Sequence, residues 1–290
     1  MTWEELNKKA VELFQKGSYV QAMQAGEEAV SAAEAQFGAD DPRLARSLNN
    51  LAEMYRARAD YSRAEPLWKR ALEIREAALG KYHPDVAVSL NNLAGAAFEQ
   101  GRYDVAERLL DRALKILEKA LGRDHPDVAT TLDNIAALYR AQGKMPGTVP
   151  LYRRALAIRE KALGSDHPEV GLTLNALAGL YYSESRFADA EPLYQRALEV
   201  AEKNFGPHHL HVASSLNSLA ATLSGLGRFE EAEPLLLRAQ QIIETNLGEK
   251  HPEVAAGLEN VAEFYDGINK PKEAEKFRKK AAEILACHSS

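Results

Sequence analysis

The sequence has a single cysteine, Cys287, and lacks any long hydrophobic run. One cysteine cannot form a disulfide within the chain, so a disulfide-stabilised fold is excluded and a reducing compartment is permitted. The longest uncharged runs, such as residues 86–98, are shorter than the roughly 20 apolar residues of a membrane-spanning helix. The first ten residues, MTWEELNKKA, lack the apolar core of a signal peptide. These absences predict a cytoplasmic chain that does not engage a membrane.

An excess of basic residues is also missing. The chain has 36 Lys and Arg against 42 Asp and Glu, a formal net charge of −6. Nucleic-acid-binding proteins usually present a basic surface, so no nucleic-acid partner is expected. The sequence contains no phosphate-binding loop, no GxSxG and no HExxH motif, and Cys287 has no evident base beside it. We therefore expect neither enzymatic activity nor a cofactor.

What the sequence does contain is a stretch of fifteen residues that recurs through the chain. The clearest copy is GKYHPDVAVSLNNLA. Successive copies are 42 residues apart without insertion or deletion, and begin at Gly38, Gly80, Gly122, Gly164, Gly206 and Gly248. A fixed period of this length is typical of a solenoid, in which each repeat packs on its neighbours.

Within one period the apolar residues follow helical spacing. Val86, Leu90 and Leu93 share one face of a first helix, and Pro84 suits its first position. A second helix follows the break at residues 101–102, and Gly122 is placed to end it. The pattern predicts an all-α chain with two antiparallel helices in each repeat. The seven predicted repeats are residues 1–37, 42–79, 84–121, 126–163, 168–205, 210–247 and 252–286.

Alanine recurs at three positions of the repeat. Such columns predict close approach of helices, since a larger side chain would overpack the contact. They contain Ala52, Ala94, Ala136, Ala178, Ala220 and Ala262; Ala64, Ala106, Ala190, Ala232 and Ala274; and Ala71, Ala113, Ala155, Ala197, Ala239 and Ala281.

These residues carry a resemblance to a known family. The pattern LxxL(A/G)xxY, then Gx(Y/F)xxA, then AL resembles the tetratricopeptide repeat. The 42-residue period with HPxVAxxLNNLA resembles the long-helix subtype found in kinesin light chain. This resemblance covers almost the whole chain. It implies a right-handed α-solenoid superhelix that binds a peptide or protein segment in a concave groove.

Asparagines on the first helices are the principal candidates for binding such a segment. In the tetratricopeptide fold their face lines the groove, where an amide can both donate to and accept from a peptide backbone. The alternative is that these amides bond to neighbouring helices and hold the repeats together. The candidates are Asn49, Asn50, Asn91, Asn92, Asn134, Asn175 and Asn217.

Arginines are candidates through the resemblance alone. In kinesin light chain, arginines at two further repeat positions help to hold acidic cargo peptides. The matching positions here hold Arg56 and Arg140 late in first helices and Arg75 and Arg159 late in second helices. Other repeats have different residues at the same positions. Among these, the aromatic residues Phe98 and Tyr182 suit an apolar ligand side chain instead.

Histidine recurs once per repeat in the linkers, which raises the question of a metal site. Neighbouring copies are separated by a whole helix pair, too far to share a metal with bonds near 2 Å. His208, His209 and His211 cluster, but without a cysteine or carboxylate at ligand spacing. We predict a packing role for the linker histidines and no metal site. One further irregularity, residues 143–150, is either harmless variation at a helix start or a local bend.

The sequence thus predicts a scaffold that binds a peptide or protein segment. Two alternatives remain: a structural or self-associating repeat array, and a regulatory module of a larger assembly. A monomer is expected, with room for weak self-association.

Overall fold

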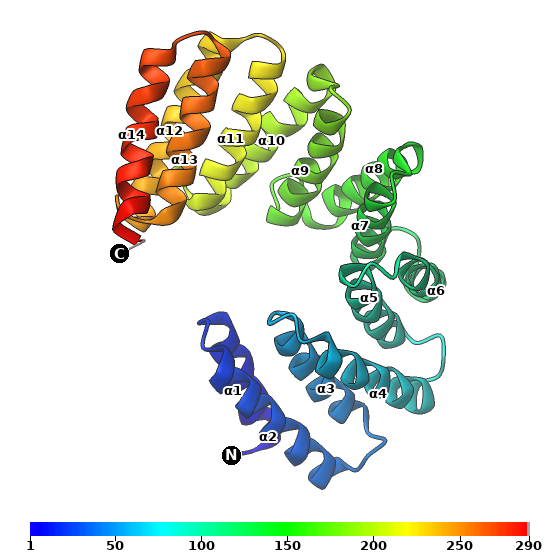
Figure 1. The fold of residues 1–290 in the computed structure, drawn as a ribbon. Coiled ribbons are helices and arrows are strands. Elements are labelled where there is room, and N and C mark those ends of the chain that lie inside the picture. Colours follow the sequence, from blue (N-terminus) through cyan, green and yellow to red (C-terminus); the bar gives the residue numbers. More distant parts are fainter. Residues whose placement is uncertain (289–290) are drawn as a thin grey trace. The chain divides into compact units, whose positions relative to one another are not determined.

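The computed structural model describes residues 1–288, with the side chains described through residue 286, so the Cys287 side chain lies outside the described residues. All regular structure in the described part is α-helix (Figure 1). The fourteen helices described are α1 Trp3–Gln15, α2 Tyr19–Phe37, α3 Pro42–Arg56, α4 Tyr61–Leu79, α5 Pro84–Glu99, α6 Tyr103–Leu121, α7 Pro126–Ala141, α8 Met145–Leu163, α9 Pro168–Ser183, α10 Phe187–Phe205, α11 Leu210–Gly225, α12 Phe229–Leu247, α13 Pro252–Gly267 and α14 Pro271–His288. The predicted all-α class and seven helix pairs are confirmed.

The linker histidine caps the first helix of its repeat. The imidazole Nδ1 of His83 accepts a hydrogen bond from the backbone N–H of Asp85 at 3.2 Å. The same bond, at 3.2–3.3 Å, is made by His125, His167, His209 and His251. In the second repeat Asp41 takes this place, its carboxylate accepting from the N–H of Arg43. Because the first N–H groups of a helix lack intrahelical partners, this cap fixes where each first helix begins.

The irregular segment at residues 143–150 does not prevent helix formation. The helix α8 begins at Met145, at the repeat position where α6 begins at Tyr103. A Cβ atom at Gly147 would lie 3.2 Å from Cδ2 of Tyr139, so a larger residue would press on that ring. Packing against Tyr139 therefore explains why a glycine occupies this position.

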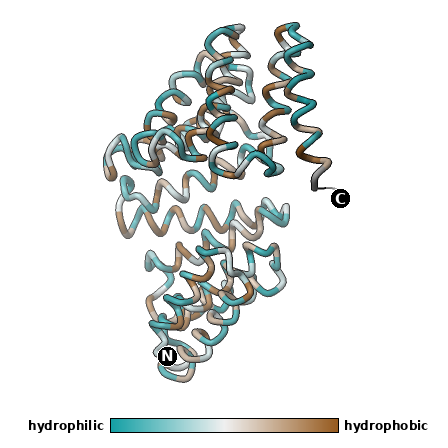
Figure 2. Tube along the Cα trace, turned by 90° about the vertical axis from the view of Figure 1, so that its left-hand side faces the viewer, coloured by the Kyte–Doolittle hydropathy of each residue, from teal (hydrophilic) through white to brown (hydrophobic). Residues whose placement is uncertain are grey.

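The alanine columns form the contacts between helices. Every alanine of the three predicted columns is buried, with at most 1 % of its surface exposed. Hydrophobic and hydrophilic residues alternate along the helices (Figure 2). Large side chains such as Trp68, Leu90 and Leu174 are fully buried in the core. None of the helices in the described part is long and apolar enough to cross a membrane.

The chain divides into two compact units, which we describe separately. Unit 1 is Met1–Ala155 and unit 2 is Leu156–Ser290, so the division falls within α8. In unit 1, Trp68 packs with Leu51 and Leu93 in one of several buried clusters. In unit 2, Val170 and Leu174 pack with Ala197. Each unit thus has its own core between first and second helices.

Candidate functional site

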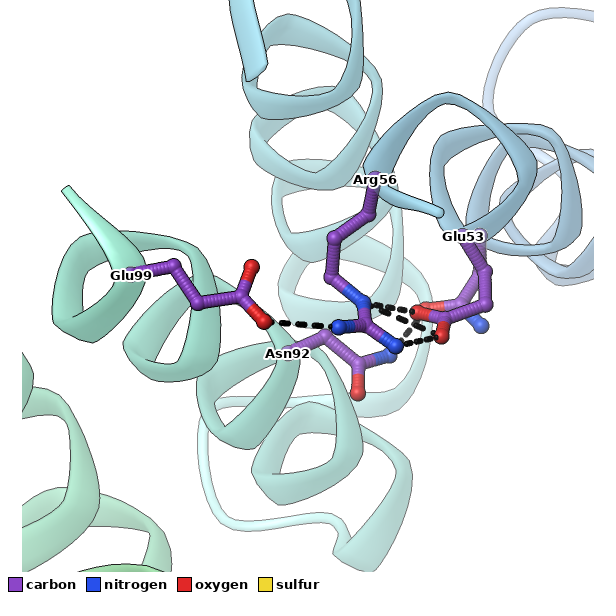
Figure 3. A network of polar contacts seen from close by, with 5 residues as sticks. Glu53, Arg56, Asn92 and Glu99 are labelled. Atoms are coloured by element: carbon purple, nitrogen blue, oxygen red, sulfur yellow. Dashed lines mark hydrogen bonds and ion pairs between the residues drawn. The ribbon is translucent and has the colours of Figure 1, made fainter. Parts of the chain in front are cut away.

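Two neighbouring first helices of unit 1 are joined by a group of polar side chains, which we call the charged network (Figure 3). It consists of Asn49, Glu53 and Arg56 on α3, and Asn92 and Glu99 on α5. The amide nitrogen Nδ2 of Asn92 donates to Oδ1 of Asn49 at 2.6 Å. This bond connects the second repeat to the third.

Arg56 completes the charged network with two carboxylates. Its Nε donates to the carboxylate oxygens of Glu53 at 3.0 and 3.1 Å, and its Nη1 donates to Oε1 of Glu99 at 2.8 Å. The hydrogen bond to Glu53 is the main reason that the pKa of Arg56 is raised, and Glu99 adds to it. The guanidinium predicted to attract an acidic ligand is therefore already neutralised by the chain's own carboxylates.

Other predicted amides of unit 1 also bond between repeats. Asn50 Nδ2 donates to Oδ1 of Asn7 at 3.4 Å, and Asn91 Nδ2 donates to Oγ1 of Thr131 at 2.9 Å. Asn7 itself donates to Oγ of Ser47 at 3.0 Å. In this unit the columns therefore supply contacts between repeats, which is the alternative role that the sequence left open.

Asn134, Asn175 and Asn217 make no such bond among the described residues, and Asn91 is bonded only through its nitrogen. Asn134 is exposed on α7. Asn91 and Asn175 each have a buried Oδ1 without a hydrogen-bond partner among the described residues. Asn217 is half-buried on α11 and lines a groove of unit 2.

Two of the four predicted arginines are buried between helices. Arg75 is 8 % exposed, and its Nη1 donates to Oγ of Ser89 at 2.7 Å and to the carbonyl of Asp85 at 3.2 Å. Burial lowers the pKa of Arg75, against the opposing charge of Asp85. Arg159 is 6 % exposed, and its Nη1 donates to Oγ1 of Thr173 at 2.7 Å.

Each of these buried arginines joins a second helix to the next first helix. Arg159 also donates through Nε to Oε2 of Glu169 at 3.1 Å. Arg140, by contrast, is exposed near the end of α7. The structure therefore does not bring the four predicted arginines together on one surface.

A hollow of unit 2, which we call the unit 2 groove, has a volume of about 610 Å³. Its aromatic side chains are Tyr182 on α9, Tyr194 on α10, Phe229 on α12 and Phe264 on α13. The amides of Asn217 and Asn260 and the carboxylate of Glu263 also face it. It is therefore largely apolar with a few polar groups, the usual character of a ligand pocket.

The unit 2 groove occupies the repeat positions of the charged network. Four periods after Asn49, Glu53, Arg56, Asn92 and Glu99 the sequence has, in the same order, Asn217, Ala221, Ser224, Asn260 and Gly267. All five of these residues line the groove. The two amides are retained, whereas the three charged side chains are replaced by small ones. The absence of those side chains leaves the space open.

The aromatic residues of the groove pack against other aromatic rings. The rings of Tyr182 and Phe187 meet edge to face, 5.3 Å between centroids, and those of Phe229 and Phe264 lie 6.2 Å apart. A Cβ atom at Gly225 would lie 2.8 Å from the Phe187 ring, so this glycine permits the ring to pack there. Sequence reasoning identified Tyr182 and Asn217 but missed Phe229, Phe264 and Gly267. A comparison of equivalent repeat positions would have identified Gly267, because it replaces the charged Glu99.

Two of the three clustered histidines, His209 and His211, pack against the ring of Phe205. The rings of Phe205, His209 and His211 lie 4.9–5.1 Å apart, centroid to centroid. His209 also caps α11. Among the described residues no group of three or more His, Cys, Asp or Glu side chains is placed to hold a metal ion.

Several solved structures are similar to this chain. A putative kinesin light chain of Podosopora anserina with nearly identical TPR-like repeats is 26% identical, with a TM-score of 0.65, over 71% of this chain and 98% of that one. BtubC (BKLC) of P. vanneervenii is 23% identical, with a TM-score of 0.67, over 82% and 92%.

A third similar structure was determined with a peptide. The Rap conjugation gene regulator of the plasmid pLS20, in complex with the Phr* peptide, is 16% identical, with a TM-score of 0.64, over 98% of this chain and 73% of that one. At this identity the likeness shows the fold. No curated protein matches the sequence.

The family model for the tetratricopeptide repeat matches overlapping pairs of repeats through nearly the whole chain. The matched segments are residues 5–77, 49–119, 85–146, 127–203, 169–242 and 211–286. They include every helix pair of the two units, in phase with the helices observed. The chain belongs to the tetratricopeptide repeat family.

Proposed function

We propose that the chain binds an extended segment of a partner protein in the unit 2 groove. The observation that carries this proposal is the replacement of Glu53, Arg56 and Glu99 by Ala221, Ser224 and Gly267 at equivalent positions. Filling these positions with charge closes the surface in unit 1. Leaving them small in unit 2 exposes aromatic rings that water solvates poorly, so an apolar ligand side chain gains free energy by covering them.

The polar groups of the groove suit a peptide backbone. Asn217 and Asn260 retain amides, and the groove that they line also contains the small residues Ala221 and Ser224. An amide can donate to a peptide carbonyl and accept from a peptide N–H, which holds an extended segment without reading its sequence. Glu263 adds a negative charge, so the groove favours a ligand that is neutral or basic there.

The predicted site is revised accordingly in this proposal. Arg56, Arg75 and Arg159 hold the chain's own helices, and Asn49, Asn50, Asn91 and Asn92 hold neighbouring repeats. Asn217 belongs to the ligand site, whereas Asn134 and Arg140 remain available on the surface of unit 1. The known complex of a similar repeat protein with a peptide supports this type of ligand.

Transplanting the charged triad tests the proposal. Peptides are selected from a displayed random library on the wild-type chain, and their affinities are measured for A221E/S224R/G267E. The triple variant should fold normally, because no atom lies near a Cβ built at Gly267 and the other two side chains face the groove. We expect a loss of affinity of about a hundredfold, equivalent to about 2.7 kcal/mol.

The matched control makes the reverse change in unit 1. The variant E53A/R56S/E99G alters the same repeat positions and should bind the selected peptides as the wild type does. Selection of no peptide at all, or unchanged affinity in A221E/S224R/G267E, would remove the unit 2 groove as the binding site.

A further inference from the structure

One position of the repeat holds a buried arginine in some repeats and an alanine in another. Arg75 and Arg159 occupy it in the second and fourth repeats, and Ala201 occupies it in the fifth. Beside Ala201 lies a pocket of about 280 Å³, which we call the Ala201 pocket. It is bounded by α9, α10 and the start of α11. The pocket is therefore the place that an arginine side chain fills elsewhere in the same protein.

The hydrogen-bond acceptors that hold the buried arginine are still present. Nη1 of Arg75 donates to the hydroxyl of Ser89 and to the carbonyl of Asp85. The residues at the corresponding positions beside Ala201 are Ser215 and His211, and both line the pocket. Ser215 Oγ donates to the carbonyl of His211 at 3.2 Å, which places the two acceptor oxygens next to each other.

A third acceptor lies at the border of the same pocket. Asn175 lines it, and its buried Oδ1 has no hydrogen-bond partner among the described residues. The equivalent side chain of Asn91 lies within 2.9 Å of the hydroxyl of Thr131, which occupies the repeat position of Ser215. A buried oxygen without a donor is costly. The pocket therefore favours a guest with several N–H donors in one plane.

The entrance suits the rest of an arginine side chain. Leu172 is 65 % exposed and Phe205 is 42 % exposed, and both line the pocket. An aliphatic stem can pack on Leu172, and a guanidinium plane can stack on an aromatic ring such as Phe205. No Lys, Arg, Asp or Glu lines the pocket, so recognition would depend on hydrogen bonds and stacking.

We propose that the Ala201 pocket binds an arginine side chain of the partner segment. The pocket and the unit 2 groove share one face of α11, since Ser214 lines the pocket while Ser218, Ala221 and Gly225 line the groove at helical spacing. A single extended segment can therefore reach both. The source of the arginine rests on the proposed function, whereas the affinity of the pocket for a guanidinium does not.

The pocket is tested with a small probe and the full chain. N-acetyl-arginine N-methylamide is titrated into the ¹⁵N-labelled protein while the side-chain amide of Asn175 and the backbone amide of Ser215 are followed by NMR. Both signals should shift saturably. The variant A201R fills the pocket from within, as Arg159 does, and should weaken binding at least about tenfold. The control A188R adds the same charge at an exposed position of α10 and should bind as the wild type does.

Two further comparisons define what the pocket recognises. The citrulline analogue keeps the planar shape but lacks the charge and one pair of donors. The lysine analogue keeps the charge and three N–H donors but lacks the planar fork, and both should bind several-fold more weakly. S215A removes one acceptor with little change in volume and should also weaken binding several-fold, which provides a test should A201R fail to fold. Equal binding of the lysine analogue, or unchanged binding by folded A201R, would overturn the proposal, as would absence of saturable shifts in the wild type.

The library selection distinguishes this inference from the proposed function. Peptides selected on the wild type should contain arginine at a fixed distance from an apolar residue, and those selected on A201R should lose only the arginine. Selected peptides without an arginine preference would refute the Ala201 pocket and leave the unit 2 groove standing. Saturable binding of the arginine probe without any selected peptide would support the Ala201 pocket and refute the unit 2 groove as a peptide site.

Discussion

Unit 1 and unit 2 use the same five repeat positions in opposite ways. In unit 1, Arg56 is held between Glu53 and Glu99, and Asn92 bonds to Asn49. In unit 2 the same positions retain two amides but have three small residues in place of the charges, and they line a groove. The alanine columns beneath are buried in both units. A groove in such a repeat can therefore be made by replacing large charged side chains with small ones while the packing of helices stays the same.

The largest effect on stability should come from replacing the buried Arg75 of unit 1 by alanine, the residue that unit 2 has at the equivalent position, Ala201. Arg75→Ala removes a buried side chain and leaves the hydroxyl of Ser89 without its donor. We expect a loss of about 2–3 kcal/mol in the free energy of unfolding, from lost packing and one unsatisfied polar group. Urea denaturation measures it, with the exposed Arg108→Ala on α6 as control. A loss no larger than that of the control would mean that Arg75 is not needed for packing.

A smaller effect should separate two equivalent asparagines. Asn49→Ala removes the acceptor of the 2.6 Å bond from Asn92 and should destabilise the chain by about 1 kcal/mol. Asn217→Ala, four repeats later, should leave the melting temperature nearly unchanged but weaken the binding of selected peptides. Thermal unfolding and peptide titration of both variants give the two readouts. If Asn217→Ala proved as destabilising as Asn49→Ala, both asparagines would be structural.

Opening the surface of unit 1 should cost still less. In E53A/R56S/E99G the ion pairs that are lost are partly exposed, with between 31 and 38 % of each charged side chain accessible. Exposed pairs contribute below about 1 kcal/mol, so the melting temperature should fall only slightly. A decrease as large as that of Arg75→Ala would show that the charged network is essential to the packing of unit 1.

A separate effect, seen only at alkaline pH, concerns one tyrosine of unit 2. Burial, together with a hydrogen bond from its hydroxyl to Glu233 at 2.7 Å, raises the pKa of Tyr265 from 10.0 to about 12. The unfolded chain therefore loses this proton first as the pH rises. The stabilising contribution is complete below pH 10 and is lost as the pH approaches 12.

The variant Tyr265→Phe tests this contribution. It should remove that part of the alkaline decline in stability, whereas Tyr182→Phe in the groove is the control. Denaturant unfolding at several alkaline pH values gives the comparison. An identical decline in the wild type and Tyr265→Phe would contradict the assignment to Tyr265.

The period and the apolar spacing were sufficient to predict the helices, because both arise from local chain geometry. The cap made by His83 could not be predicted in the same way, because it depends on the direction in which Nδ1 points. Arg75 and Arg159 were predicted as ligand contacts through resemblance alone. The signal for their burial was present 14 residues later, in the hydroxyl-bearing Ser89 and Thr173 that accept their hydrogen bonds.

The asparagine columns show a second limit of sequence reasoning. Asn49 and Asn217 occupy equivalent positions, but only Asn49 has a close amide partner, in Asn92. Whether an amide bonds to its neighbour or faces a groove depends on the side chains around it, and Ala221 and Ser224 change those surroundings. One-letter patterns within a column do not contain this information. A comparison of all five positions of the network between repeats does contain this information.

The linker at each repeat boundary has a consequence for how the number of repeats can change in evolution. Second helices end at a glycine with positive φ, such as Gly80 or Gly122, and the next first helix begins at a capping residue three positions later. Recombination between two such linkers removes or duplicates 42 residues in frame, and both flanking helices stay whole. The number of repeats can therefore change in one step, and a copied repeat has its helix caps and its alanine contacts already in place.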